Sequence, residues 1–180
     1  MTFASGPASA GKGIVAYMTS TVRLRLFNNI VNPGVRTLVR HRPDGRLARA
    51  VALLSYQGRV SGRSFTIPVE YAKDADGRYV IVPGEPEHKA WWKNFRTPMT
   101  VRVLAAGSQV TGQAELIADS AERRDALAVY FRRFPAAARM QRLPRRDDGR
   151  FDQERLISLA DHLVVIRVSP SSTNGQPGQS

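Results

Sequence analysis

The stretch that decides the fold is residues 58–71, Gly-Arg-Val-Ser-Gly-Arg-Ser-Phe-Thr-Ile-Pro-Val-Glu-Tyr, in which a loop of small residues runs directly into an alternating strand. From residue 64 onward the side chains follow the period of two that is typical of a strand with one buried face. Pro68 has no N–H to give to a β-ladder, so we expect it at an edge, a bulge or a barrel corner.

The loop at residues 58–63, here called the anion loop, has the composition of an anion-binding turn. Gly58 and Gly62 permit backbone angles and close approaches that side chains would forbid, and Ser61 adds a hydroxyl. Arg59 and Arg63 supply forked, permanently charged donors suited to phosphate or carboxylate. An ordinary hairpin turn with solvated arginines is the alternative, because glycine and serine are common in turns.

Working outward, the period of two begins at about residue 50 and predicts mostly antiparallel strands. They are expected at residues 50–56, 64–72, 78–82, 100–104, 109–117 and 162–168, with turns at 57–63, 74–77 and 105–108. A helix is expected at residues 120–134, capped by Asp119 with Glu122 three residues on. Residues 136–161 fit no single pattern. This arrangement predicts an α+β fold, a small barrel with helices packed outside it.

The ends of the chain differ in composition from the middle. Residues 1–13 and 169–180 are small and polar, so we expect them to be disordered around a single domain at 14–168. Within that domain, residues 14–42 are predicted to form basic, amphipathic helices that cover the core. A helix pair of this kind is also what a peripheral membrane protein presents, so an anionic membrane surface is an alternative partner.

A second informative segment is residues 88–95, His-Lys-Ala-Trp-Trp-Lys-Asn-Phe, which follows the third predicted strand. Together the two segments resemble the deazaflavin-dependent nitroreductase and quinone reductase family, over roughly residues 22–135. In that family a Gly-Arg-x-Ser-Gly-Arg/Lys turn leaves through a strand with Thr-x-Pro. After one more strand comes His-x-Ala-Trp-aromatic-x-Asn-hydrophobic. The matching positions are Gly58, Arg59, Ser61, Gly62, Arg63, Thr66, Pro68, His88, Ala90, Trp91, Trp92, Asn94 and Phe95.

The resemblance implies a split β-barrel of about six strands with flanking helices, paired in a homodimer. It also implies an 8-hydroxy-5-deazaflavin coenzyme of the F420 type, with a phosphate and a polyglutamate tail, that passes a hydride to a quinone or nitroaromatic acceptor. The implied cofactor-binding residues are Arg59, Ser61, Gly62, Arg63, Thr66, Pro68, His88, Trp91, Trp92 and Asn94. One tryptophan is expected in the core and the other beside the ring, and Tyr130 is a candidate for the acceptor pocket.

One feature departs from the family pattern. Members that bind the deazaflavin usually have a longer loop rich in glycine and serine or asparagine ahead of the histidine, which helps to surround the cofactor phosphate. Here only Val82-Pro83-Gly84-Glu85-Pro86-Glu87 occupies that place. An FMN- or haem-type binder with the same barrel, or a cofactor-free binding protein, therefore stands as the alternative reading.

Charge and composition narrow the choice of partners. The net charge of +12 attracts anions, and an anionic cofactor, acidic lipid headgroups and nucleic acid all fit it. No helix-turn-helix or RNA-recognition signature favours a specific nucleic-acid partner. The sequence has no cysteine, which excludes disulfides and thiolate metal sites and fits a cytoplasmic protein, with attachment to the inner face of the membrane as a variant. Isolated histidines predict no metal site, and no Gly-x-Ser-x-Gly motif points to a hydrolase.

Overall fold

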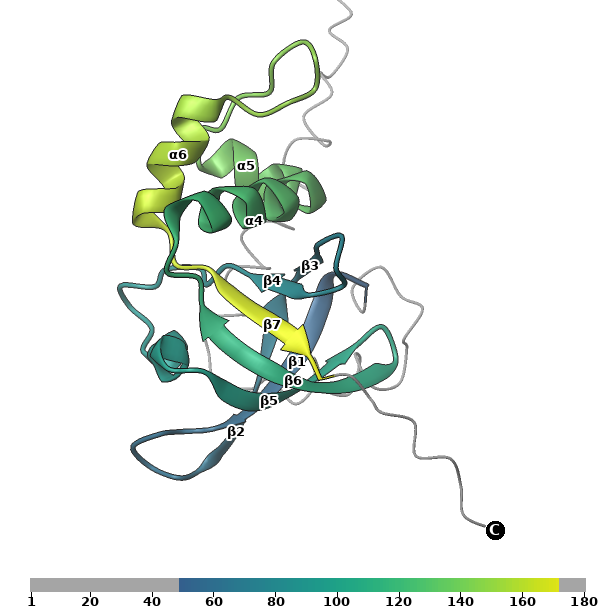
Figure 1. Ribbon diagram of the computed structural model, residues 1–180, viewed down its shortest axis with the longest axis vertical. Coiled ribbons are helices and arrows are strands. Elements are labelled where there is room, and N and C mark those ends of the chain that lie inside the picture. The colour runs from purple at the N-terminus through teal and green to yellow at the C-terminus, as the bar shows by residue number, and fades with distance from the viewer. Residues whose placement is uncertain (1–48, 172–180) are drawn as a thin grey trace, which may run out of the picture.

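The protein is described by a computed structural model over residues 49–171. Its body is a seven-stranded antiparallel sheet in the order β2-β1-β5-β6-β7-β4-β3 (Figure 1). The strands are β1 Val51–Gln57, β2 Ser64–Glu70, β3 Ala72–Lys73, β4 Tyr79–Ile81, β5 Met99–Ala105, β6 Ser108–Leu116 and β7 Ile166–Pro170. The helices are the 3-10 helix η1 Trp91–Arg96 and the α-helices α4 Ser120–Arg133, α5 Pro135–Met140 and α6 Gln153–His162.

The sheet curls because its two outermost strands are neighbours in the chain. β2 and β3 stand at opposite ends of the strand order, yet only Tyr71 separates them in sequence. The Tyr71 N–H donates to the Ala50 carbonyl at 3.3 Å, which fixes the corner. The predicted α+β split barrel is confirmed, with seven strands where about six were expected. Pro68 lies on β2, an edge strand of this sheet, where its missing N–H costs no ladder bond.

The interior of the barrel is filled by the side chains that the alternating pattern places on one face. In β1 these are Ala52, Leu54 and Tyr56, all buried, and they meet apolar side chains from β5, β6 and β7. Phe95 of η1 is fully buried in the same cluster. The short helix η1 is therefore held to the barrel by a core residue, and it carries the adjacent tryptophans with it.

A second apolar cluster lies between the α-helices and the outer face of β3 and β4. Leu127 and Phe131 of α4 pack there with Leu156 of α6 and Val80 of β4. The predicted cap of α4 is confirmed, because the Asp119 carboxylate accepts from the Glu122 N–H at 2.8 Å. Figure 1 shows the three α-helices gathered at one end of the sheet, while the hairpin formed by β1 and β2 extends away from the other.

Most predicted elements are confirmed to within a residue or two at each end, and the larger differences from the sequence prediction are the following. The strand predicted at residues 162–168 is wrong at its start, because His162 is the last residue of α6 and the strand begins at Ile166. The strand predicted at 64–72 is two strands with a corner at Tyr71. Residues 136–161 hold α5 and α6, and β7 runs two residues into the segment predicted as the disordered tail. The predictions for residues 1–13, for the helices at 14–42 and for residues beyond 171 lie outside the described residues.

Candidate functional site

The anion loop is a tight hairpin turn with its own internal hydrogen bonds. The Gly58 N–H donates to the Arg63 carbonyl and the Gly62 N–H donates to the Gly58 carbonyl, both at 2.8 Å. The Arg63 N–H donates to Ser61 Oγ at 3.3 Å. Gly62 has φ +63°, the left-handed region that favours glycine. Since these three amides already have acceptors inside the turn, a ligand at this loop is left to the side chains.

Gly58 is needed for a different reason, namely a close approach. A Cβ built there would lie 2.8 Å from Phe65 Cε2 and 2.9 Å from Ser61 Oγ. The Phe65 ring lies over this glycine and is stacked on Tyr56, with ring centroids 5.5 Å apart and an interplanar angle of 23°. The aromatic pair stiffens the base of the loop, which leaves the side chains at its tip to meet a ligand.

Arg59 does not extend freely into solvent. Its Nε donates to the Asn94 carbonyl at 2.6 Å, and its Nη2 donates to the carbonyls of Thr97 and Pro98. Its backbone N–H donates to Asn94 Oδ1 at 2.9 Å, and Asn94 Nδ2 donates in turn to the Trp91 carbonyl at 2.8 Å. The structure thus brings the anion loop against η1, although 35 residues separate Arg59 from Asn94 in sequence.

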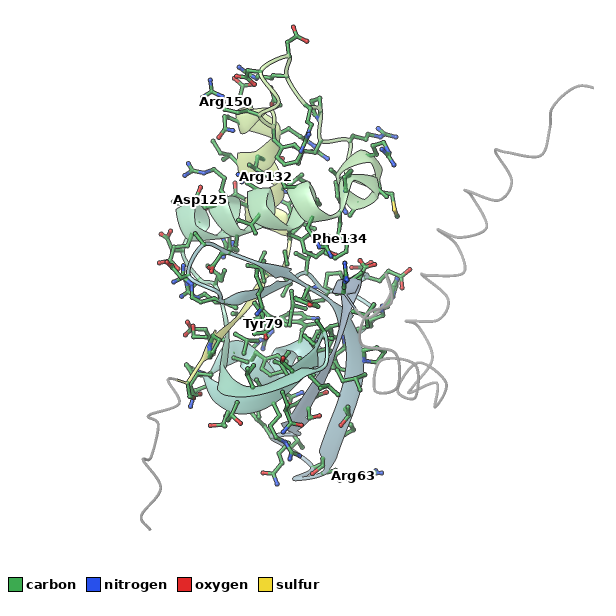
Figure 2. All side chains as sticks on the ribbon, turned by 90° about the vertical axis from the view of Figure 1, so that its right-hand side faces the viewer. Arg63, Tyr79, Asp125, Arg132, Phe134 and Arg150 are labelled. Atoms are coloured by element: carbon green, nitrogen blue, oxygen red, sulfur yellow. The ribbon has the colours of Figure 1, made fainter. Side chains whose placement is uncertain are left out.

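Arg63 is the arginine of the anion loop that stays available for a ligand. Its side chain is exposed and makes no ion pair with any residue between 49 and 171. Figure 2 shows it at the outer end of the β1–β2 hairpin. On β2, Thr66 and Pro68 are half-buried, and Thr66 Oγ1 lies 2.9 Å from Ser55 Oγ on β1. The structure therefore keeps Arg63, Ser61 and Thr66 on one hairpin.

The two tryptophans of η1 are both half-buried against the barrel core. Trp91 meets Phe95 edge-on, with centroids 6.1 Å apart, and Phe95 meets Tyr56 edge-on at 5.3 Å. Trp92 donates from Nε1 to the Pro86 carbonyl at 2.8 Å. That bond joins η1 to the short loop at residues 82–87. The prediction that one tryptophan is core and the other faces a ring stays a prediction, since each has both a packed and an exposed part.

Two cations lie beside the Trp92 ring, and sequence reasoning missed them. Lys93 Nζ lies 5.8 Å and the Arg96 guanidinium 5.6 Å from the Trp92 ring centroid. The spacing of Trp92 and Arg96, four residues apart on a helical turn, was the available signal. His88 is highly exposed, with its side chain at 77%, and stands 3.9 Å from the Glu87 carboxylate. The side chains at this end of the barrel offer hydroxyl, guanidinium and ammonium donors beside indole rings, a combination that fits an anionic, aromatic ligand.

Tyr130 is not brought together with the rest of the predicted site. It is buried in the helical cluster, where its OH donates to Glu70 Oε2 at 3.1 Å. Burial, together with the charge and hydrogen bond of Glu70, raises the pKa of Tyr130 far above its ordinary value. Figure 2 shows α4 and Arg63 at well-separated places along the molecule. A core role accounts for this residue.

Comparisons with known proteins agree with this geometry. The family model described as F420H(2)-dependent quinone reductase matches residues 29–144. This match covers more than half of the 180 residues and includes both the anion loop and η1. The chain belongs to the F420H(2)-dependent quinone reductase family. Its cofactor is therefore the deazaflavin F420, and the resemblance drawn from residues 58–71 and 88–95 is confirmed.

Solved structures with a similar fold are known. An F420-H2 dependent reductase, FDR-A, superposes with a TM-score of 0.50 at 20% identity, covering 67% of this chain and 95% of that one. A structure described as a domain-swapped dimer superposes with a TM-score of 0.51 at 21% identity, covering 84% of this chain and 98% of that one. At these identities the likeness shows the fold. A search of curated proteins gave no match.

Two further observations concern residues 49–171 only. No group of three or more histidine, aspartate or glutamate side chains there is arranged to hold a metal ion. None of the helices in that range has both the length and the apolar character required to cross a membrane.

Proposed function

We propose that this reductase transfers a hydride from reduced F420 to a quinone-type acceptor, with nitroaromatic compounds as surrogate acceptors. The observation that carries the proposal is the joining of the anion loop to the tryptophan helix η1 by Arg59 and Asn94. This contact supports a site in which phosphate-type donors lie beside an aromatic wall, the pair of features that an anionic ring cofactor requires. The family match supports the same conclusion.

Each segment has its own part in the proposed site. Arg63 and the Ser61 hydroxyl, at the turn that Gly62 permits, hold the cofactor phosphate. Thr66 and Pro68 continue that side of β2, while His88, Trp91 and Trp92 form the wall beside the ring, and Asn94 joins that wall to the anion loop. Lys93 and Arg96 add positive charge for the acidic tail. The reduced deazaflavin supplies the hydride, and the protein contributes binding, orientation and exclusion of water.

The direct test is turnover. Full-length protein mixed with reduced F420 and menadione is expected to form oxidised F420 faster than the same mixture without protein, because a bound pair of reactants is held at reacting distance. The measurement is the absorbance of oxidised F420 over time. Reduced FMN serves as the comparison donor. Binding of FMN in preference to F420, or no oxidation of F420 above the uncatalysed rate with any quinone or nitroaromatic, would contradict the proposal.

Arg63→Gln should weaken F420 binding without unfolding the protein. A charge-assisted hydrogen bond is worth about 1.5 to 3 kcal/mol, so affinity is expected to fall by about tenfold to a hundredfold. The matched control is Arg150→Gln, which removes the same charge from an exposed arginine in a distant part of the molecule (Figure 2). Titration of F420 fluorescence measures both. Equal losses in the two variants would mean that net charge, and not a contact at the anion loop, governs affinity.

We also propose a homodimer in the cytoplasm. The solved structure described as a domain-swapped dimer supports association in this fold, and the lack of cysteine supports a reducing compartment. Val60 at the tip of the anion loop is fully exposed and Phe65 nearby is 38% exposed, so the hairpin offers apolar surface to a second copy. Light scattering during gel filtration is expected to give twice the mass of the 19.9 kDa chain, and a monomer mass at all concentrations would refute the dimer.

A further inference from the structure

The role of Arg59 is set by where its donors point. An arginine that binds a cofactor phosphate turns its fork toward the ligand. Here Nε and Nη2 are directed at the carbonyls of Asn94, Thr97 and Pro98. These carbonyls lie in and just beyond the last turn of η1, where a helix leaves its C=O groups without N–H partners. Arg59 therefore caps the carboxyl end of the tryptophan helix from another part of the chain.

Asn94 completes the connection in the opposite direction. Its Oδ1 accepts the backbone N–H of Arg59, and its Nδ2 donates to the Trp91 carbonyl. The side-chain amide thus joins the backbone of the anion loop to the first residue of η1. Among residues 49–171, five hydrogen bonds involve Arg59 or the Asn94 side chain, and they link the loop to both ends of the helix.

We propose that Arg59 is a positioning residue, not a phosphate ligand: it fixes the tryptophan helix relative to the anion loop and so sets the angle at which the ring is presented for hydride transfer. This inference rests on the proposed function, and it changes the role that the sequence suggested for one of its residues. The phosphate is left to Arg63, which has an exposed and unengaged side chain within the described residues. Affinity and reactivity then depend on different arginines of one loop.

The geometry explains why lysine cannot substitute. Three carbonyls at different places are reached by one planar guanidinium, which has donors fixed in a fork. A lysine ammonium keeps the charge but is a compact point donor on a flexible stem, so it cannot hold all three at once. Arg59→Lys therefore removes the positioning while preserving the electrostatic attraction for an anion. A direct phosphate contact would tolerate the same change far better, since lysine is itself a good phosphate binder.

The experiment compares Arg59→Lys with Arg63→Gln in full-length protein. For Arg59→Lys we expect F420 affinity within about threefold of wild type and a single-turnover rate of hydride transfer to menadione lowered about tenfold or more, the signature of a lost orientation. For Arg63→Gln we expect the opposite result, in which F420 affinity falls more than the single-turnover rate of hydride transfer. Asn94→Ala should resemble Arg59→Lys. An Arg59→Lys variant that loses affinity as strongly as Arg63→Gln, or that transfers hydride at the wild-type rate, would overturn the proposal.

A second measurement needs no cofactor. Hydrogen exchange in the free protein should accelerate in residues 58–63 and 91–98 when Arg59 is changed to lysine. The reason is that the hydrogen bonds of the guanidinium, which join the two segments, are then lost. Exchange in α4 should stay unchanged, since that helix packs on a separate cluster. Unchanged exchange in both segments would refute the coupling. If wild-type protein fails to oxidise reduced F420, the proposed function fails, while this exchange result still decides whether Arg59 joins the loop to η1.

Discussion

Phe95→Ala is expected to lower the free energy of unfolding by about 3 to 5 kcal/mol, the usual cost of truncating a buried phenylalanine. The Phe95 side chain has no exposed surface, and its ring meets Tyr56 and Trp91 edge-on. The change removes these contacts and leaves a cavity that η1 cannot fill without leaving the barrel. Denaturation by urea, with the midpoint and slope fitted separately, measures the loss.

The matched control is Met140→Ala. Met140 is also a large apolar side chain near the end of a short helix, but it is 61% exposed, so its truncation should change stability by no more than about 0.5 kcal/mol. The Phe95 variant should also bind F420 less well, because Phe95 is the residue that anchors η1 in the barrel core. A Phe95→Ala protein as stable as the Met140 variant would show that η1 is not anchored by its core residue.

Tyr130 should make the protein less stable in alkaline solution. Burial, and then Glu70, raise the pKa of Tyr130 above the value of about 10 that it has in the unfolded chain. Above pH 10 the unfolded chain therefore releases a proton that the folded protein keeps, so the unfolded state binds fewer protons and the free energy of unfolding falls as pH rises. The expected slope from this residue is about 1.4 kcal/mol per pH unit, and it is absent below pH 10.

Tyr130→Phe separates this effect from general alkaline denaturation. The variant should be less stable at pH 7 by about 1 kcal/mol, because the hydrogen bond to Glu70 is lost, and its stability should fall less steeply above pH 10. The remaining slope belongs partly to Tyr56 and Tyr71, whose pKa values burial also raises. Urea denaturation between pH 8 and pH 11 measures both curves. Parallel curves for wild type and variant would show that Tyr130 ionises as readily folded as unfolded.

The alternation of side chains predicted most of the barrel, because a sheet that buries one face imposes a period of two on its sequence. It failed at Tyr71 for a physical reason. Val69 and Tyr71 continue the alternation of apolar and polar positions through the corner, so nothing in the pattern marks the end of β2. In α6 the buried residues Leu156, Leu159 and Ala160 follow a helical spacing after the Asp152 cap, so the signal for this helix was present in the sequence and was missed.

Prediction of the candidate site from the sequence was limited in a similar way. Residue types alone identified Arg59 and Asn94 as members of it, since a forked donor and a side-chain amide suit a polar site. They could not identify the partner of each, because the contact between them spans the strands β2, β3 and β4. From sequence alone, a charged donor in a turn is interpreted as a ligand-binding group. The fold can instead bring backbone carbonyls within its reach as acceptors. Here the carbonyls at the end of η1 are those acceptors.

The position of β7 bears on how the chain reaches its native state during synthesis. This last strand of the sheet pairs with β6 on one side and β4 on the other. Each of these neighbours therefore lacks one pairing partner until β7 is in place. Until residues 166–170 leave the ribosome, two strand edges stay open, and open edges recruit strands from other chains. Gly112 allows the final insertion, since a Cβ there would lie 2.4 Å from the Ser169 carbonyl oxygen. Nascent chains stalled before β7 are therefore the species most prone to aggregate, and a chaperone that shields strand edges would serve this protein best at that stage.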